Sequence, residues 1–409
     1  MPTNVPAPLA LRRRGPLMPC IDQYKPLIRN LFGCSWRLLL LSTMLGLTGC
    51  RTVSFYQQAI TGHATIVFKK RPLERVVDDP ATPDNVRDKL NLILNLKAFA
   101  QSELFLPAKG QFRHYADIDR PFVVWDIYAA REFSLDAKHW WYPFVGSLSY
   151  RGYFTEQQAR KDALLLQQEG YDVFVGGIDA YSTLGWFQDP VLSTFIDRED
   201  TDLADLIFHE LAHQKVFLDG DTDFNEAFAT ALAREGVRRW LQAKEDPETR
   251  TGWEQRTRRE DQFVALILGA RRQLEALYAQ AERSGTMDAD QAQHLRLAKA
   301  GVFHQLRADY QSLKQDWGGV DEYDIWFDYP LNNARLNAEA TYYEWIPAFE
   351  QLLRESGRDL QAFYEAVERL GREDATERKL LLEALHMRSE WLKADSRSLT
   401  GRSGHLPSP

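Results

Sequence analysis

Two histidines four residues apart, His209 and His213, constrain this chain more than any other feature of its sequence. They end a largely apolar stretch whose pattern predicts a helix from Thr201 to about Val216. On a helix, this spacing places both imidazoles on one face, about one turn apart. Two nitrogens placed in this way can bind one metal ion at about 2.0–2.1 Å. The chain must then bring a further ligand to this face of the helix.

The residue after the first histidine, Glu210, completes the pattern His-Glu-Leu-Ala-His. Its side chain points beside an ion held by the two histidines rather than at it. A carboxylate in that place can take a proton from zinc-bound water, which is the chemistry of zinc peptidases. We therefore predict one zinc ion per chain, bound by His209 and His213, with Glu210 as the general base.

Two downstream carboxylates compete for the place of the third zinc ligand. Glu226 opens a second predicted helix, from Phe224 to about Ala243, for which Asp223 is a suitable N-cap. If that helix is antiparallel to the first, Glu226 can face the two histidines, as in the gluzincins. Asp219 lies where metzincins place their third ligand, but those enzymes need a glycine midway, and Val216 stands there. We predict Glu226 as the ligand.

The N-terminus has the layout of an export leader. An apolar run over 38–47 has the length of a signal-peptide core and is too short to span a bilayer comfortably. It ends in Leu-Thr-Gly-Cys, which resembles the lipobox of bacterial lipoproteins, whose cysteine carries a diacylglycerol. The resemblance implies a signal peptide over 1–49 and a lipid anchor on Cys50. Because Arg51 rather than an aspartate follows, it also implies the bacterial cell envelope, at the outer membrane facing the periplasm. An ordinary secretory peptide or a short membrane anchor is the alternative.

The cysteines limit the kinds of metal site that are available. The other two, Cys20 and Cys34, both precede Cys50, so cleavage at the lipobox leaves one cysteine and no disulfide within the chain. A metal must therefore use histidine and carboxylate ligands. The net charge is -8 with acids and bases interspersed, which argues against a nucleic-acid partner.

The rest of the chain predicts an α+β fold that is rich in helix and has a small sheet. Aromatic and β-branched runs predict strands at 122–128, 144–150 and 171–175. Thr155 caps a predicted helix that Gly170 ends. Long apolar stripes predict an antiparallel helical hairpin over 255–317. We expect one metallopeptidase domain over 50–392, including the hairpin, and a disordered polar tail over 393–409.

Several segments besides the two histidines carry a resemblance to one family: Ser149–Phe154, Ala180–Trp186, Phe208–His213, Gly220–Ala229, Arg234–Trp240 and Leu331–Leu336. With the lipobox, they make the chain similar to a bacterial family of zinc aminopeptidases, which are gluzincin-like lipoproteins with the HExxH pattern. The resemblance spans about residues 50–370 and implies a zincin-like fold and a peptide substrate. Two features differ from thermolysin-like gluzincins: the gap between His213 and Glu226 is shorter, and Thr230 stands where those enzymes often have an aspartate that supports a ligand.

The other groups of a peptidase site have several candidates each. An oxyanion donor could be Tyr342, Tyr343 or His304. A peptide terminus or backbone could be held by Asn332, Asn333 or Arg335. A substrate ammonium could be held by Glu339, Glu344 or the acids around Asp321.

Three functions are compatible with the sequence. The first is a zinc amino- or endopeptidase, the second is a non-catalytic metal-binding envelope lipoprotein, and the third is a zinc hydrolase of a non-peptide amide. Glu210 favours a catalytic site, because a structural zinc site needs no acid beside the first histidine and uses four protein ligands.

Overall fold

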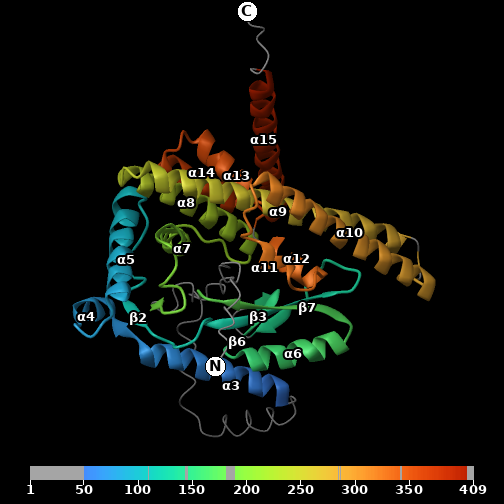
Figure 1. Ribbon diagram of the computed structural model, residues 1–409, viewed down its shortest axis with the longest axis horizontal. Coiled ribbons are helices and arrows are strands. Elements are labelled where there is room, and N and C mark those ends of the chain that lie inside the picture. Colours follow the sequence, from blue (N-terminus) through green and yellow to red (C-terminus); the bar gives the residue numbers. More distant parts are fainter. Residues whose placement is uncertain are drawn as a thin grey trace, which may run out of the picture. The chain divides into compact units, whose positions relative to one another are not determined.

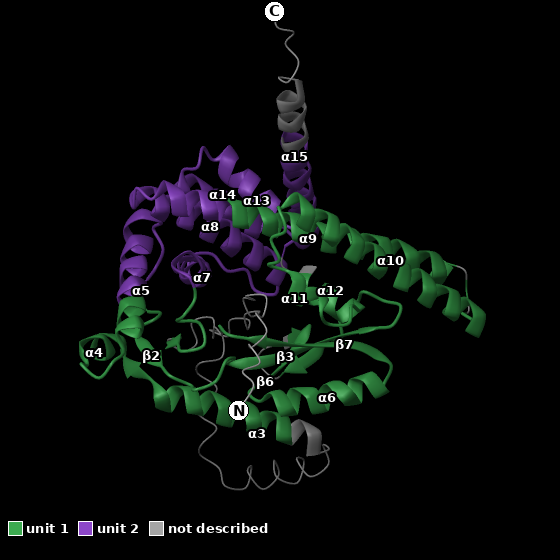
Figure 2. Ribbon diagram, viewed as in Figure 1, with its two compact units in different colours: residues 1–90, 110–198, 255–340 green, residues 91–109, 199–254, 341–409 purple. Residues whose placement is uncertain are grey.

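The computed structural model describes residues 50–108, 110–142, 146–180, 189–283, 285, 287–340 and 343–402. The fold is α+β and rich in helix, as predicted, with small sheets (Figure 1). The chain divides into two compact units, and each is formed by several separate stretches of sequence (Figure 2). Unit 1 comprises 1–90, 110–198 and 255–340, and unit 2 comprises 91–109, 199–254 and 341–409.

Unit 1 contains all the strands of the described residues. Its helices and strands run in the order α3 (Cys50–Lys69), β1 (Arg71–Pro72), α4 (Leu73–Asp78), the start of α5 (Asp84–Glu103), β2 (His114–Ala116), β3 (Val124–Arg131), β4 (Trp140–Tyr142), β5 (Gly146–Leu148), β6 (Tyr150–Tyr153), α6 (Glu156–Gln168), β7 (Tyr171–Ile178), β8 (Val191–Leu192), most of α9 (Pro247–Arg283), α10 (Ala289–Asp316), α11 (Asp324–Phe327) and α12 (Asn333–Ala340). The strands form a sheet ordered β1-β2-β8, a sheet ordered β6-β3-β7 and the hairpin β4-β5.

The sheet β6-β3-β7 is antiparallel and has a different cover on each face. Strand β3 pairs with β7 along its whole length, from Val124 opposite Ile178 to Arg131 opposite Tyr171. Because side chains alternate along a strand, neighbouring residues of β3 enter different cores. Ile127 and Ala129 pack with residues of α3 and α6, whereas Tyr128 packs with Ala334 and Ala338 of α12.

Several local predictions hold in unit 1. Helix α6 begins after Thr155 and ends before Gly170, whose φ of +82° suits glycine. The predicted cap itself does not form, because the Thr155 hydroxyl donates to the side chain of Gln158 at 2.7 Å instead of accepting from the helix backbone. The hairpin predicted over 255–317 is formed by α9 and α10, with the rings of Phe263 and Tyr310 6.4 Å apart. Helix α10 starts with a capping box between Asp288 and Gln291.

All the regular secondary structure in the described residues of unit 2 is helical. It contains the end of α5, α7 (Asp200–Ala212), α8 (Thr222–Ala243), the start of α9, α13 (Ile346–Glu355), α14 (Leu360–Arg372) and α15 (Ala375–Arg402). Its aromatic core joins Phe224 and Phe228 of α8 to Phe349 of α13 and Phe363 of α14. This core packs α13 and α14 against α8, the helix that carries Glu226.

The predicted disordered tail differs in part from the structure. Helix α15 continues past residue 393 to Arg402, and residues 403–409 lie outside those described. The reason is local: no glycine or proline interrupts α15 before Gly401, so its polar residues can continue the helix. Among the described residues, no helix is both long enough and apolar enough to cross a membrane.

Candidate metal centre

Helix α7 carries the two histidines and is buried along most of its length. Leu203, Leu206, Ile207 and Leu211 are almost fully buried, and this packing holds the helix in unit 2. The helix ends at Ala212, earlier than the sequence predicts. His213 is its C-cap, with φ of -61° and ψ of -22°, and it therefore keeps helical geometry. Its ring still lies one turn from that of His209.

Helix α8 is fixed at its start by a residue other than the predicted Asp223. The side chain of Asp221 caps the helix by accepting a hydrogen bond from the backbone nitrogen of Phe224 at 3.1 Å. Arg378 donates to the same carboxylate at 2.9 Å, and this contact favours Asp221. The sequence alone could not show it, because Arg378 is distant along the chain.

The loop between α7 and α8 is held by Asn225, a residue whose role the sequence analysis missed. Its amide oxygen accepts from the backbone nitrogen of Leu218 at 2.8 Å, and its amide nitrogen donates to the carbonyl of the same residue at 2.8 Å. Asn225 is buried and directly precedes Glu226. In the sequence, an asparagine next to a predicted ligand was the signal that could have indicated this role. Its two hydrogen bonds to Leu218 fix where α8 begins.

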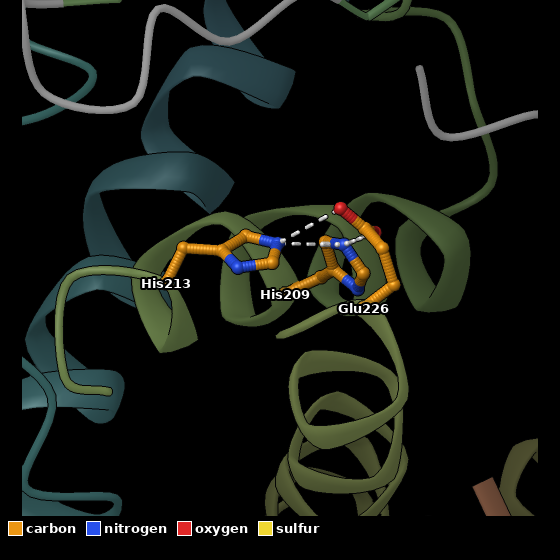
Figure 3. Close-up of side chains that lie close together, drawn as sticks. All are labelled: His209, His213 and Glu226. Atoms are coloured by element: carbon orange, nitrogen blue, oxygen red, sulfur yellow. Dashed lines mark hydrogen bonds and ion pairs between the residues drawn. The ribbon is translucent and has the colours of Figure 1, made fainter. Parts of the chain in front are cut away.

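The structure brings together His209, His213 and Glu226 (Figure 3). All three are buried, and their ligand atoms lie within 4.8 Å of one another. The Nε2 atoms of the two histidines are 3.1 Å apart. Glu226 Oε2 is 3.1 Å from His209 Nε2, and Glu226 Oε1 is 3.8 Å from His213 Nε2. Ligands about 2.0–2.1 Å from a tetrahedral zinc ion are about 3.3 Å apart, so the cluster has the dimensions of a zinc site.

Hydrogen bonding explains these contacts less well than a shared cation does. His209 Nε2 faces both His213 Nε2 and a Glu226 oxygen at 3.1 Å. A neutral imidazole nitrogen either carries one hydrogen or offers one lone pair, so it cannot donate to the carboxylate and accept from the second ring at once. A cation between the three groups interacts favourably with all of them. The donor set of two imidazoles and a carboxylate suits zinc.

Asp219, the competing third ligand, is exposed and lies outside the cluster of ligand atoms that the described residues form. Glu210 is half-buried on α7 next to His209, and it too is outside the cluster. The geometry therefore favours Glu226 over Asp219 as the third ligand. The role of Glu210 as a base stays a prediction.

Thr230 lies one turn after Glu226 on α8 and approaches the other side of the His209 ring. Its hydroxyl oxygen is 3.4 Å from His209 Nδ1. A group at this nitrogen sets the orientation and tautomer of a ligand histidine. Thr230 thus occupies the place where the sequence analysis noted a missing aspartate, and it offers a neutral partner instead of a charged one.

Two neighbouring residues of α8 hold this helix in unit 2. A Cβ atom on Gly236 would lie 2.7 Å from Phe208 and 2.8 Å from Leu104, so only glycine allows α8 to pack this closely. Glu235 is buried and is bound by Arg238, Arg239 and Arg358. Burial alone would raise the pKa of Glu235, but the arginine hydrogen bonds and charges hold it below its ordinary value.

The structure places the candidates for oxyanion and substrate binding in different surroundings. Tyr342 lies outside the described residues. Asn333 is fully buried in unit 1, where its amide nitrogen donates to the carbonyls of Arg131, Glu132 and Ser134. It therefore holds a loop and is not available to a peptide.

Arg335 is also buried, and its guanidinium lies over three aromatic rings, those of Phe174, Trp326 and Tyr329. His304, Asp321 and Glu344 are exposed, Tyr343 is half-buried, and Glu339 is buried and accepts from the Trp326 ring nitrogen.

Comparison with known proteins gave one match. The model of the family described as "Putative aminopeptidase" matches residues 54–382 of this chain, a span that includes α7, α8 and all three clustered residues. No curated protein and no solved structure matches the chain.

Proposed function

We propose that this chain, which belongs to the putative aminopeptidase family, is a zinc-dependent peptidase with its centre at His209, His213 and Glu226. One observation carries the proposal: three buried side chains of the types that bind zinc converge at zinc-site distances. The match to a family of aminopeptidases supports a peptide as substrate. The same match favours removal of N-terminal residues over cleavage within a chain.

Three protein ligands leave the fourth position of a tetrahedral ion open, as a catalytic site requires. When bound, zinc would supply Lewis-acid polarisation of the substrate carbonyl and would lower the pKa of water. In the proposed mechanism, Glu210 accepts the proton of the attacking water and later delivers a proton to the leaving amine. Its position supports this role, since it follows His209 directly and is not among the clustered ligands. Thr230 would orient the His209 ring through Nδ1.

We also propose that the chain is a lipoprotein of the bacterial cell envelope, anchored through Cys50 at the outer membrane and facing the periplasm. The lipobox-like residues before Cys50 support this location. Residues 1–49 lie outside the described part of the chain, and helix α3 begins at Cys50.

Zinc content tests the metal centre. Purified protein should contain about one zinc ion per chain, and the double variant His209→Ala, His213→Ala should contain almost none. Asp219→Ala is a matched control, since it removes the exposed carboxylate that lies outside the cluster. Full zinc retention in the double variant would rule out this site.

Peptide hydrolysis tests the function itself. Pairs of peptides with free and with acetylated N-termini should show cleavage of the free member only, if the enzyme is an aminopeptidase. Cleavage of both would indicate an endopeptidase. Zinc-loaded protein that is inert on both, and on other amides, would favour a non-catalytic metal-binding lipoprotein. Hydrolysis restricted to non-peptide amides would favour the amide hydrolase.

A further inference from the structure

Helix α3 packs against unit 1 with one face, and this fixes its rotation. Phe55 and Ile66 on that face are buried. Gln58 accepts from the backbone nitrogen of Phe154 at 2.9 Å. Gly62 lies so close to the same residue that a Cβ atom would be 2.0 Å from the Phe154 ring. Figure 1 shows the helix running beside α6, with which it shares a core against strand β3.

The opposite face of α3 is exposed and carries three large apolar side chains, with exposed Gln57 and Thr61 as its polar neighbours. Ile60, Val67 and Phe68 are 69%, 42% and 87% exposed. Counted in one direction around a helix of 3.6 residues per turn, these positions lie about 160°, 140° and 240° from Gly62, all within about 60° of the side opposite to it. A single exposed apolar side chain is ordinary, but three on one face, including an almost fully exposed phenylalanine, form a stripe that indicates an interaction surface.

The charge of this segment is opposite to that of the whole chain. The chain carries 58 acidic residues and a net charge of -8, yet residues 50–72 contain no aspartate or glutamate. They contain Arg51, Lys69, Lys70 and Arg71. Arg71 is paired with Asp79 at 2.7 Å, whereas Lys69 is exposed beside Phe68. An apolar stripe that ends in a cation, without acids, complements a phospholipid surface, where acyl chains lie below phosphate groups.

We propose that this face of α3 lies in the surface of a phospholipid bilayer. Ile60, Val67 and Phe68 enter the boundary between headgroups and acyl chains, and Lys69 meets the phosphates. The contact is interfacial, because the other face of α3 stays packed on unit 1 through Phe55, Gly62 and Ile66. The inference goes beyond the proposed peptidase activity and rests on the proposed envelope location. Because Gly62 and Gln58 fix the helix on unit 1, the contact also sets the orientation of that unit on the membrane.

Spin labels at single cysteines test this contact. The background is the full chain with Cys20→Ser and Cys34→Ser, and the label positions are Ile60→Cys and Phe68→Cys. Leu164→Cys is the matched control, because Leu164 is an apolar residue of unit 1 that is 58% exposed on helix α6. Each protein is bound to vesicles of phosphatidylethanolamine and phosphatidylglycerol. Collisions of the label with oxygen, which enriches in the bilayer, are compared with collisions with a water-soluble nickel chelate.

Labels at 60 and 68 should collide more with oxygen than with the chelate, and the label at 164 should show the reverse. Equal values at all three positions would overturn the proposal, whatever the state of Cys50. A second outcome would also overturn the proposal: labels at 60 and 68 that remain in water when the protein is bound to vesicles but become immobile in cell envelopes. That result would indicate a protein partner. The unsubstituted background protein, treated with the same label, reports separately whether Cys50 is blocked by lipid.

Discussion

The packing of α8 behind the metal centre gives a prediction whose magnitude follows from the structure. In Gly236→Ala, the new methyl group would lie 2.7 Å from the Phe208 ring and 2.8 Å from Leu104, and both residues are fully buried. Overpacking of this kind costs about 1–3 kcal/mol. The gain from replacing glycine inside a helix is about 0.5–1 kcal/mol. We therefore expect a net loss of stability of up to about 2 kcal/mol.

Two other glycines of unit 2 provide controls for the helix propensity alone. A Cβ atom at Gly252 would have no neighbour within 4 Å, and one at Gly371 would meet only an ordinary contact at 3.8 Å. Gly252→Ala and Gly371→Ala should each stabilise the protein by about 0.4–1 kcal/mol. Urea unfolding followed by circular dichroism measures all three variants.

Gly236→Ala should also weaken zinc binding at the metal centre. Phe208 directly precedes His209, so a displaced Phe208 ring should move that ligand, and Gly236→Ala should bind zinc more weakly than either control. A Gly236→Ala protein as stable as Gly252→Ala would refute the packing argument.

Three further predictions concern individual side chains. Glu226→Gln should lower zinc affinity at least about ten- to a hundredfold, and Asp219→Asn should lower it much less. Isothermal titration measures both affinities, and a larger loss in Asp219→Asn than in Glu226→Gln would make Asp219 the ligand. Thr230→Val should weaken zinc binding about tenfold while Thr230→Ser restores it; equal affinities would remove Thr230 from the site. Because the folded pKa of Glu235 is lowered, its stabilising contribution is present above its ordinary value of 4.5 and is lost as the pH falls through the folded pKa. Glu235→Gln should therefore lower the free energy of unfolding by about 1–3 kcal/mol at pH 7, and by progressively less as the solution is acidified below pH 4.5. Urea titrations at several pH values measure this difference between variant and wild type. A difference that does not change with pH would contradict this account.

The sequence predicted those elements whose signals are local. Helix α6 begins after Thr155 and ends before Gly170 as expected, because helix ends and positive φ depend on the residue and its neighbours, although the Thr155 side chain does not cap the helix. The spacing of His209 and His213 is likewise a helical property, and it placed both rings on one face before any tertiary contact was known.

Contacts between distant residues decided the rest. Asp221 rather than Asp223 caps α8, where Arg378 binds the capping carboxylate. Asn333 appeared available for a substrate, yet its amide is bonded to three carbonyls of a loop about 200 residues earlier. The division into two units, each assembled from three stretches of chain, has no marker in composition or charge.

The most direct test of the proposed function is the ratio of peptidase activities of wild type and Glu210→Gln at equal zinc content. The amide keeps the size of the side chain but cannot accept a proton, and Glu210 lies outside the ligand cluster. The variant should therefore fold and bind zinc normally, while kcat/KM for a peptide with a free N-terminus falls about 10²–10⁴-fold. Unchanged kcat/KM in zinc-loaded Glu210→Gln would contradict the proposed mechanism.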